Sequence, residues 1–253
     1  MTTATINALN KFKAGVKGTF KKHIDNHNKL DPNNPNIFKD AVNAAYGDAK
    51  RTFEGINGRA TTANNNLAKK IQKYFKTPAT PMKFDELHND WCEEYIADLK
   101  SEGYDKATYG RAQKVVNMTF KYLYCLDNAT VTYNDHFENC HVALDSYTLE
   151  WIWRNCGLAG NEIHDDWSKI QYYDRSTQKK NIVGYEEIKK RYRNNKPIVY
   201  PDTPFQSEFI FWEEIKEHLA AESFYSTLPG VIDKDTFKSM SLQDKYAEIK
   251  RII

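Results

Sequence analysis

The sequence predicts an all-α protein of 253 residues. Apolar residues recur every three or four positions along much of the chain, which is the spacing of one face of a helix. A segment of proline and asparagine at 31–35 and a segment with two prolines at 77–81 interrupt this spacing. In the middle of the chain, two helical stretches flank a short turn between Gly103 and Gly110. We therefore expect helices joined by turns and packed as a single domain over residues 1–253.

The N-terminal part is expected to be a helical bundle. The apolar positions of its first helix are Ile6, Leu9, Phe12, Val16 and Phe20. Those of its second helix are Phe38, Val42, Ala45, Ala49 and Phe53. Both sets have the spacing of one helical face. A polar break at 55–66 precedes a shorter helix, from Leu67 to about Phe75.

The central part is predicted to be a helix, a turn and a second helix. Asp85 follows the prolines of 77–81 and is a suitable N-cap for a helix that ends near Gly103. The second helix follows Gly110, and its apolar residues are Val115, Val116, Phe120, Leu123 and Tyr124. A helix with so many apolar positions is expected to be mostly buried.

Helices are also expected in the C-terminal half. The sequence predicts a short helix over 146–155 and another near 185–193, in a stretch from 157 to 204 that is otherwise polar and irregular. Helical spacing continues over 242–252. It is also found at Phe209, Trp212, Ile215 and Leu219.

Composition narrows the classes of function and site. Lys and Arg number 36 against 34 Asp and Glu, so a surface that binds a polyanion must be local. The four cysteines are widely spaced without a Cys-x-x-Cys pair, which favours reduced thiols over a disulfide framework. His136, Cys140 and His141 lack the paired spacing of structural zinc, so we expect no metal site.

The sequence further predicts an intracellular protein. Residues 1–24 carry five lysines among their apolar residues, and so lack the uninterrupted apolar core of a signal peptide. No stretch approaches the roughly 18 apolar residues of a membrane-spanning helix. We expect a cytoplasmic monomer with no membrane contact.

Two residues near the centre of the chain suggest chemistry. Lys114 stands at the start of an apolar helix, among Ala112, Val115 and Val116. Partial desolvation there favours the neutral amine, which is the nucleophilic form of lysine. Asp145 follows a short apolar run where a new helix begins, so a plain N-cap role explains it equally well. The chain between them is long enough to return to the first turn of the lysine's helix.

The segment resembles the helix-hairpin-helix DNA glycosylases. The resemblance covers roughly 91–153 and is nearest to the archaeal oxidised-guanine branch, often called AGOG. In that family a lysine follows a glutamine at the start of the second hairpin helix, as in Gln113-Lys114. A catalytic aspartate follows a Pro-Val-Asp-like tripeptide, here Ala143-Leu144-Asp145. The chain lacks the proline of that tripeptide and the Pro-Gly-x-Gly run of the family's hairpin.

The resemblance implies a bifunctional DNA glycosylase with Lys114 as its nucleophile. The amine attacks the sugar carbon that bears the base and displaces the base, and the resulting Schiff base can eliminate phosphate. Asp145 stabilises positive charge on the sugar and assists proton movement. No metal or organic cofactor is implied. A helix-hairpin-helix core would lie at about 85–155, with the N- and C-terminal helices packed around it.

The implied partner is double-stranded DNA with a damaged or modified nucleotide flipped out of the duplex. Gly110 and Arg111 are candidates for contact with the DNA backbone. The candidate base contacts are Gln113, His141, Trp91, Tyr147 and Trp151. Each aromatic residue among them is equally a candidate for the core. Oxidised guanine and a hypermodified base of foreign phage DNA are both possible substrates, so repair and defence stay open.

Two interpretations without catalysis also stay open. One is a helix-hairpin-helix module that binds DNA without excising a base, which the two departures from the family pattern favour. The other is a helical protein-interaction scaffold, which predicts no DNA binding. Two basic clusters are either a DNA-backbone patch or a solvated face. Their residues are Lys179, Lys180, Lys189, Lys190, Arg191 and Arg193.

Overall fold

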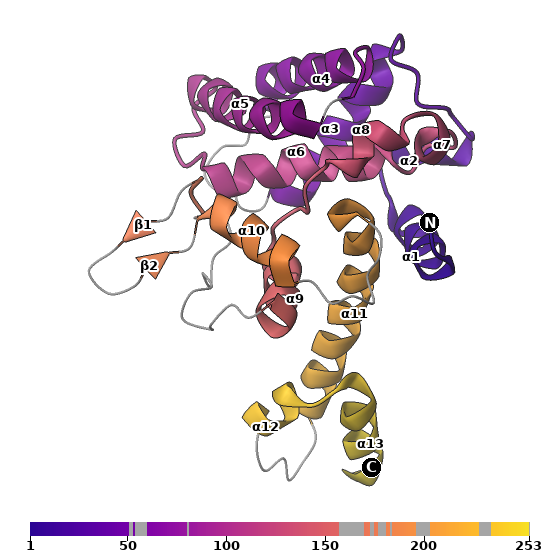
Figure 1. Ribbon diagram of the computed structural model, residues 1–253, viewed down its shortest axis with the longest axis vertical. Helices are drawn as coiled ribbons and strands as arrows, with labels where there is room; N and C mark the ends of the chain where they lie inside the picture. The colour runs from indigo at the N-terminus through magenta and orange to yellow at the C-terminus, as the bar shows by residue number, and fades with distance from the viewer. Residues whose placement is uncertain are drawn as a thin grey trace.

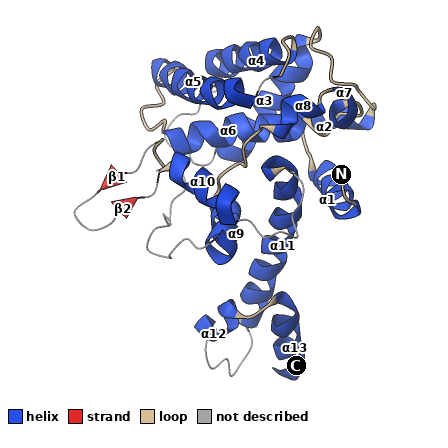
Figure 2. Ribbon diagram, in the orientation of Figure 1, coloured by secondary structure: helices blue, strands red, loops and turns tan. Residues whose placement is uncertain are grey.

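The computed structural model confirms the all-α class (Figure 1). It describes all residues except 51–52, 54–59, 80, 157–169, 173–174, 177–180, 183, 196–202, 228–233 and 253. In the described part of the chain, the strands are β1 (Arg175–Ser176) and β2 (Asn181–Ile182) (Figure 2). They form one antiparallel pair in which Arg175 lies opposite Ile182.

The helices of the N-terminal half are α1 (Thr3–Gly15), α2 (Thr19–Asp25), α3 (Pro35–Ala49), α4 (Thr61–Phe75), α5 (Pro81–Ser101) and α6 (Tyr109–Leu123). Two short helices follow, α7 (Ala129–Thr132) and α8 (Asn134–Glu138). The remaining helices are α9 (Ser146–Cys156), α10 (Tyr185–Asn195), α11 (Pro204–Tyr225), α12 (Lys234–Ser239) and α13 (Leu242–Ile252).

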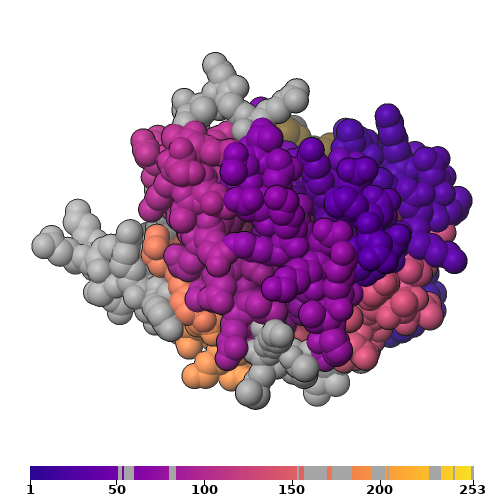
Figure 3. Space-filling view, turned by 90° about the horizontal axis from the view of Figure 1, so that it is seen from above, coloured from indigo at the N-terminus to yellow at the C-terminus, as the bar shows by residue number. Residues whose placement is uncertain are grey.

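α6 is the central helix of the molecule. It packs against α3 and α5, and α4 packs on those two helices (Figure 1). Seen from the side of α4 and α5, the N-terminal half covers most of the molecule (Figure 3). Thr108 caps α6, because its hydroxyl accepts the N–H of Arg111 at 3.4 Å. Every residue of α6 except Lys114 is buried, so Lys114 is the one side chain of this helix that is partly accessible.

A second group of helices lies below α6 in Figure 1. α11 packs against α1 and α9, and α10 packs against α9. The first helix of the chain is therefore joined to a helix from its last fifth. None of the helices, over the residues that can be described, combines the length and the apolar character needed to cross a membrane.

The buried apolar residues form two clusters. The larger one extends from α1 to the first half of α11. The smaller one joins the far end of α11 to α12 and α13, and consists of Ala221, Tyr225, Phe237 and Ile249. Within it, the rings of Tyr225 and Phe237 stack with their centroids 3.6 Å apart.

The first predicted helix is divided in two. α1 ends at Gly15 and α2 begins at Thr19, and Gly18 between them has φ 74°, in the left-handed region that glycine tolerates best. Val16 and Phe20 are nevertheless both buried. The apolar spacing continues across the break because both helices face the same core. Periodicity alone therefore could not reveal the break between α1 and α2.

Two predicted helix starts were also wrong. α5 begins at Pro81 instead of after Asp85, because proline is well suited to the first position of a helix. Asp85 therefore lies inside α5, where its carboxylate contacts other elements. α4 begins at Thr61, within the break expected at 55–66. The predicted helices at 146–155, 185–193 and 242–252 are confirmed as α9, α10 and α13.

Candidate active site

Lys114 and Asp145 meet where α6 and α9 begin. Lys114 Nζ lies 3.1 Å from Asp145 Oδ2, and the two side chains are 12% and 10% exposed. Asp145 Oδ1 accepts the backbone N–H groups of Tyr147 at 3.0 Å and Thr148 at 3.1 Å. Asp145 is therefore the N-cap of α9, and its second oxygen remains directed at the lysine amine.

Buried amide side chains of α6 fix the backbone that leads into Asp145. Gln113 Oε1 accepts the N–H of Leu144 at 3.1 Å, and its Nε2 donates to the carbonyl of Leu144 at 2.6 Å. Asn117 Nδ2 donates to the carbonyl of Val142 at 3.1 Å. Gln113 is fully buried, so it positions Asp145. The prediction that it contacts a base was therefore wrong.

A buried ion pair holds the same segment from the other side. Glu208 of α11 accepts the N–H of Ala143 through Oε2 at 3.0 Å. Its Oε1 lies 2.8 Å from Lys121 Nζ, and both side chains are 2% exposed. Burial raises the pKa of Glu208, and the charge of Lys121 opposes that rise. Side chains of α6 and α11 thus hold the backbone of residues 142–144 by hydrogen bonds from two sides.

The Lys114–Asp145 pair opens onto a cavity of about 420 Å³. Its aromatic lining residues are Phe12, Tyr122, Tyr147 and Trp212. Its charged lining residues are Lys11, Asp48, Lys114, Lys121, Asp145, Glu213 and Lys216. The rings of Tyr147 and Trp212 are 5.9 Å apart, and Lys216 Nζ lies 4.3 Å from the centroid of Trp212. Aromatic faces and charged groups around one cavity suit a flat heteroaromatic ligand.

Asp48 is a second carboxylate of this cavity, and sequence reasoning missed it. It stands in the last turn of α3 and accepts the hydroxyl hydrogen of Tyr122 at 2.7 Å. Desolvation by the cavity walls raises its pKa, against the lowering effects of Tyr122 and of the charge on Lys114. Gly47 before it lines the cavity, and a Cβ there would meet no neighbouring atom. The sequence signal that could have indicated this carboxylate is Gly47-Asp48, a glycine followed by an aspartate in the last turn of a helix.

Trp212, Phe12 and the lysines of the rim were also missed as site residues. Phe12 and Trp212 were identified only as members of apolar helical faces. Lys11 and Lys216 lie on different helices, α1 and α11, and only the packing of these two helices brings them to one cavity. Because these residues are about 200 positions apart, no local sequence pattern indicates that they line the same cavity.

Two of the predicted base contacts belong to the core instead. Trp91 is buried and stacks on Phe120 with ring centroids 5.8 Å apart. Trp151 is buried and stacks on Phe211 at 4.5 Å. Both therefore serve packing, and the prediction that they contact a base was wrong. Tyr147, which is 36% exposed, does line the cavity beside Asp145.

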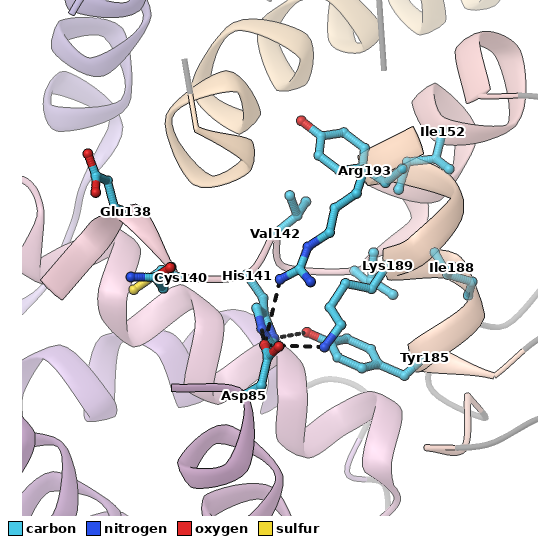
Figure 4. Close-up of a pocket in the computed structure, with 13 residues that line it drawn as sticks. Asp85, Glu138, Cys140, His141, Val142, Ile152, Tyr185, Ile188, Lys189 and Arg193 are labelled. Carbon is cyan, nitrogen blue, oxygen red and sulfur yellow. Dashed lines mark hydrogen bonds and ion pairs between the residues drawn. The ribbon is translucent and has the colours of Figure 1, made fainter. Parts of the chain in front are cut away.

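His141 lines a different cavity, of about 490 Å³ (Figure 4). Its Nδ1 is 2.9 Å from the hydroxyl of Tyr185, and its Nε2 contacts Asp85. Lys189 and Arg193 also point to Asp85, at 3.3 and 3.6 Å (Figure 4). Burial lowers the pKa of His141 to about 4. His141 is thus a neutral structural link and not, as predicted, a contact in the lysine's cavity.

The start of α6 does not offer the predicted phosphate site. The N–H of Gly110 donates to the carbonyl of Ile170 at 2.9 Å. Arg111 is 9% exposed, and its guanidinium donates to the carbonyl of Lys106. Because the N–H of Gly110 already has a protein acceptor and Arg111 is buried, the prediction that Gly110 and Arg111 contact the DNA backbone was wrong.

Of the described residues in the predicted basic clusters, Lys189, Arg191 and Arg193 lie in ion pairs, whereas Lys190 is exposed and has no ion pair with a described residue. Lys189 pairs with Asp85 and also with Glu186 at 2.8 Å. Arg191 pairs with Glu187 at 3.0 Å. Lys179 and Lys180 lie outside the described residues.

The suspected metal ligands have other partners. His136 Nε2 is 2.8 Å from the carbonyl of Thr77, and its ring stacks on Phe75 at 5.2 Å. The thiol of Cys140 donates to the carbonyl of His136 at 3.3 Å. The four cysteines are buried free thiols. Over the described part of the chain, no three His, Cys, Asp or Glu side chains form a group that could hold a metal ion.

Comparisons with protein-family models, with curated proteins and with solved structures find no match to the chain.

Proposed function

We propose that this chain is a DNA glycosylase with lyase activity that excises an oxidised or otherwise modified base. The observation that carries the proposal is the Lys114–Asp145 contact of 3.1 Å at the wall of a cavity lined by aromatic rings. Lys114 is also the one residue of α6 that is not buried, because Lys121, the other lysine of this helix at the cavity, is buried in its ion pair with Glu208.

The chemistry begins with the neutral amine of Lys114. Its lone pair attacks C1′ of the flipped nucleotide, the C1′–N bond breaks, and the bonding electrons leave with the base. Once the C1′–N bond has broken, Asp145 takes the proton that the attached amine loses and passes it to the departing base. The negative charge of Asp145 stabilises the positive charge that develops on the sugar.

The second stage uses the adduct at C1′. The sugar ring opens to a Schiff base between Nζ and C1′. Loss of a proton from C2′ then expels the 3′ phosphate, and water releases the lysine by hydrolysis. All these steps proceed with side chains and water alone.

The cavity gives the base a place to bind once it has left the duplex. Tyr147 and Trp212 offer aromatic faces for stacking, and Asp48 and Lys216 offer polar groups for the base edge. Flipping a base out of the duplex costs a few kcal/mol of stacking and pairing energy, which such contacts in the cavity can offset.

Borohydride trapping tests the proposal. The probes are duplexes that carry oxidised guanine, uracil, glucosylated hydroxymethylcytosine or an abasic site. The wild type is compared with Lys114→Gln and with the control Lys11→Gln, which removes a lysine from the same cavity. We expect an adduct on at least one base-bearing duplex with the wild type and the control, and none with Lys114→Gln.

Each other outcome has a defined meaning. An adduct formed by Lys114→Gln would assign the nucleophile to another lysine. Release of free base without an adduct would indicate a monofunctional enzyme in which Asp145 is the main catalyst. If no duplex loses a base or forms an adduct, the proposal is wrong, and DNA binding would then distinguish a binding module from a protein scaffold.

A further inference from the structure

The first two helices carry an unusual concentration of one charge. Residues 1–24 include five lysines and no aspartate or glutamate, in a chain whose acidic and basic residues nearly balance overall. Lys21 pairs with Asp25, and Lys11 is 3.7 Å from Glu213 with its side chain 59% exposed. The other three lysines, Lys13, Lys17 and Lys22, have no ion pair with any described residue. We call these three the N-terminal basic surface.

Two lysines of this surface stand next in the sequence to residues that line the Lys114–Asp145 cavity. Lys13 and Lys17 directly follow Phe12 and Val16, which line the cavity. Lys17 and Lys22 are exposed, and Lys13 is half-buried. A nucleotide flipped into the cavity keeps its phosphates at the mouth, where cations are needed to hold the strand.

Most of the other expected phosphate contacts are already used by the protein, although Lys190 of α10 is exposed and has no ion pair with a described residue. Gly110 donates to Ile170, Arg111 is buried, and the described basic residues of α10 include Lys189 and Arg191 in ion pairs with acids. Most of the apolar face of α1 is covered as well, because Ala8 and Leu9 are buried in the core, although Ile6 is 43% exposed. A membrane surface would need that face, so the exposed charge suits a polyanion better than a lipid bilayer.

We propose that the N-terminal basic surface binds the phosphate backbone of duplex DNA beside the cavity. The identity of the polyanion as DNA rests on the proposed function. The surface supplies affinity without sequence preference, while the cavity selects the base. The strand beside the flipped nucleotide runs along α1 and α2, and not along the hairpin before α6.

The test is a salt titration of DNA affinity with two triple variants. The first is Lys13→Gln, Lys17→Gln and Lys22→Gln together. The control is Lys69→Gln, Lys73→Gln and Lys76→Gln, which removes the same charge from exposed lysines of α4 and its C-cap. The probes are an unmodified duplex and anionic vesicles, and single-turnover excision is measured separately at saturating duplex.

Loss of three phosphate contacts should lower the slope of log affinity against log salt by about 2 to 3. At low salt the first variant should bind duplex roughly 10 to 100 times more weakly, while the control stays within about threefold of the wild type. At saturating duplex the excision rate of the first variant should match that of the wild type, because none of its three replaced lysines lines the cavity.

Three results would overturn the proposal. They are an unchanged salt slope in the first variant, an equal loss in the control, and binding to vesicles in preference to duplex. The affinity titration does not depend on excision. If the proposed catalysis is wrong, no base is released, but the effect of the first triple variant on duplex affinity can still be measured. If only the basic surface is wrong, base release is normal and the first triple variant binds duplex as the wild type does.

Discussion

Lys114 owes its setting to its neighbours on α6. Every other residue of that helix is buried, and the hydrogen bonds of Gln113 and Asn117 bring the Asp145 segment back to it. The sequence predicted that Lys114 and Asp145 would meet, and the contact of 3.1 Å confirms it. Their catalytic roles stay a proposal.

Replacement of Asp145 separates its two roles. Asn caps a helix about as well as Asp, whereas Ala does not, so Asp145→Ala should be about 1 kcal/mol less stable than Asp145→Asn in urea unfolding. Both should slow base excision by roughly 10² to 10⁴, because both remove the charge beside Lys114. If Asp145→Asn excised bases at the wild-type rate in single-turnover assays, capping would be the only role of this residue.

The neutral state of His141 predicts a dependence of stability on pH. Burial lowers its pKa from 6.5 to about 4, so below pH 6.5 the unfolded chain takes up a proton that the folded chain refuses. This contribution to stability is complete above pH 6.5 and is lost as the pH falls towards 4, by roughly 3 kcal/mol. His88, whose pKa burial also lowers, acts in the same direction.

Urea unfolding at several pH values between 7 and 4 measures this effect. The difference between the wild type and His141→Gln isolates it, because the carboxylates that titrate in the same range are common to both. The free energy of unfolding of the variant should fall less steeply with acid. Parallel curves for the two proteins would show that His141 accepts a proton in the folded state.

At the scale of elements, the segment 142–144 depends on a buried ion pair. Glu208→Gln keeps an acceptor for the N–H of Ala143 but leaves Lys121 without its counter-charge. We expect a loss of about 3 kcal/mol or more in the free energy of unfolding. Adding Lys121→Met should restore most of that loss, since it removes the uncompensated charge. A double variant as unstable as the single one would show that packing around Lys121, not charge, was responsible.

The elements divide into those that local sequence reveals and those it hides. α9, α10 and α13 were predictable because each buries one face with regular spacing. The break at Gly18 and the start of α5 at Pro81 depend on backbone conformation, which apolar spacing does not report. The short helices α7, α8 and α12 are too brief to show a period.

The candidate site was predictable only in part, for a related reason. Lys114 lies at the start of one predicted helix, and Asp145 and Tyr147 lie at the start of another. Trp91 and Trp151 were misplaced because an aromatic residue has the same local pattern in a core as in a cavity. Only the fold shows which faces are already covered.

For the molecule as a whole, the division into two apolar clusters predicts uneven stability. The smaller cluster of α11, α12 and α13 has four buried apolar residues and little contact with the rest of the core. Hydrogen exchange should therefore show α12 and α13 opening at lower free energy than α3 and α6. Equal protection of all four helices would mean that the molecule unfolds as one cooperative unit.

The packing of α1 on α11 also decides when the cavity is formed during synthesis. α1 is made before α11, yet Trp212 and Lys216, and the Glu208 that holds the N–H of Ala143, come from α11, which begins at Pro204. A growing chain thus carries Lys114 and Asp145 long before it has walls to enclose a nucleotide. On the proposed function, a chain without α11 should not act on DNA, because Lys114 becomes part of a closed pocket only after α11 has been made.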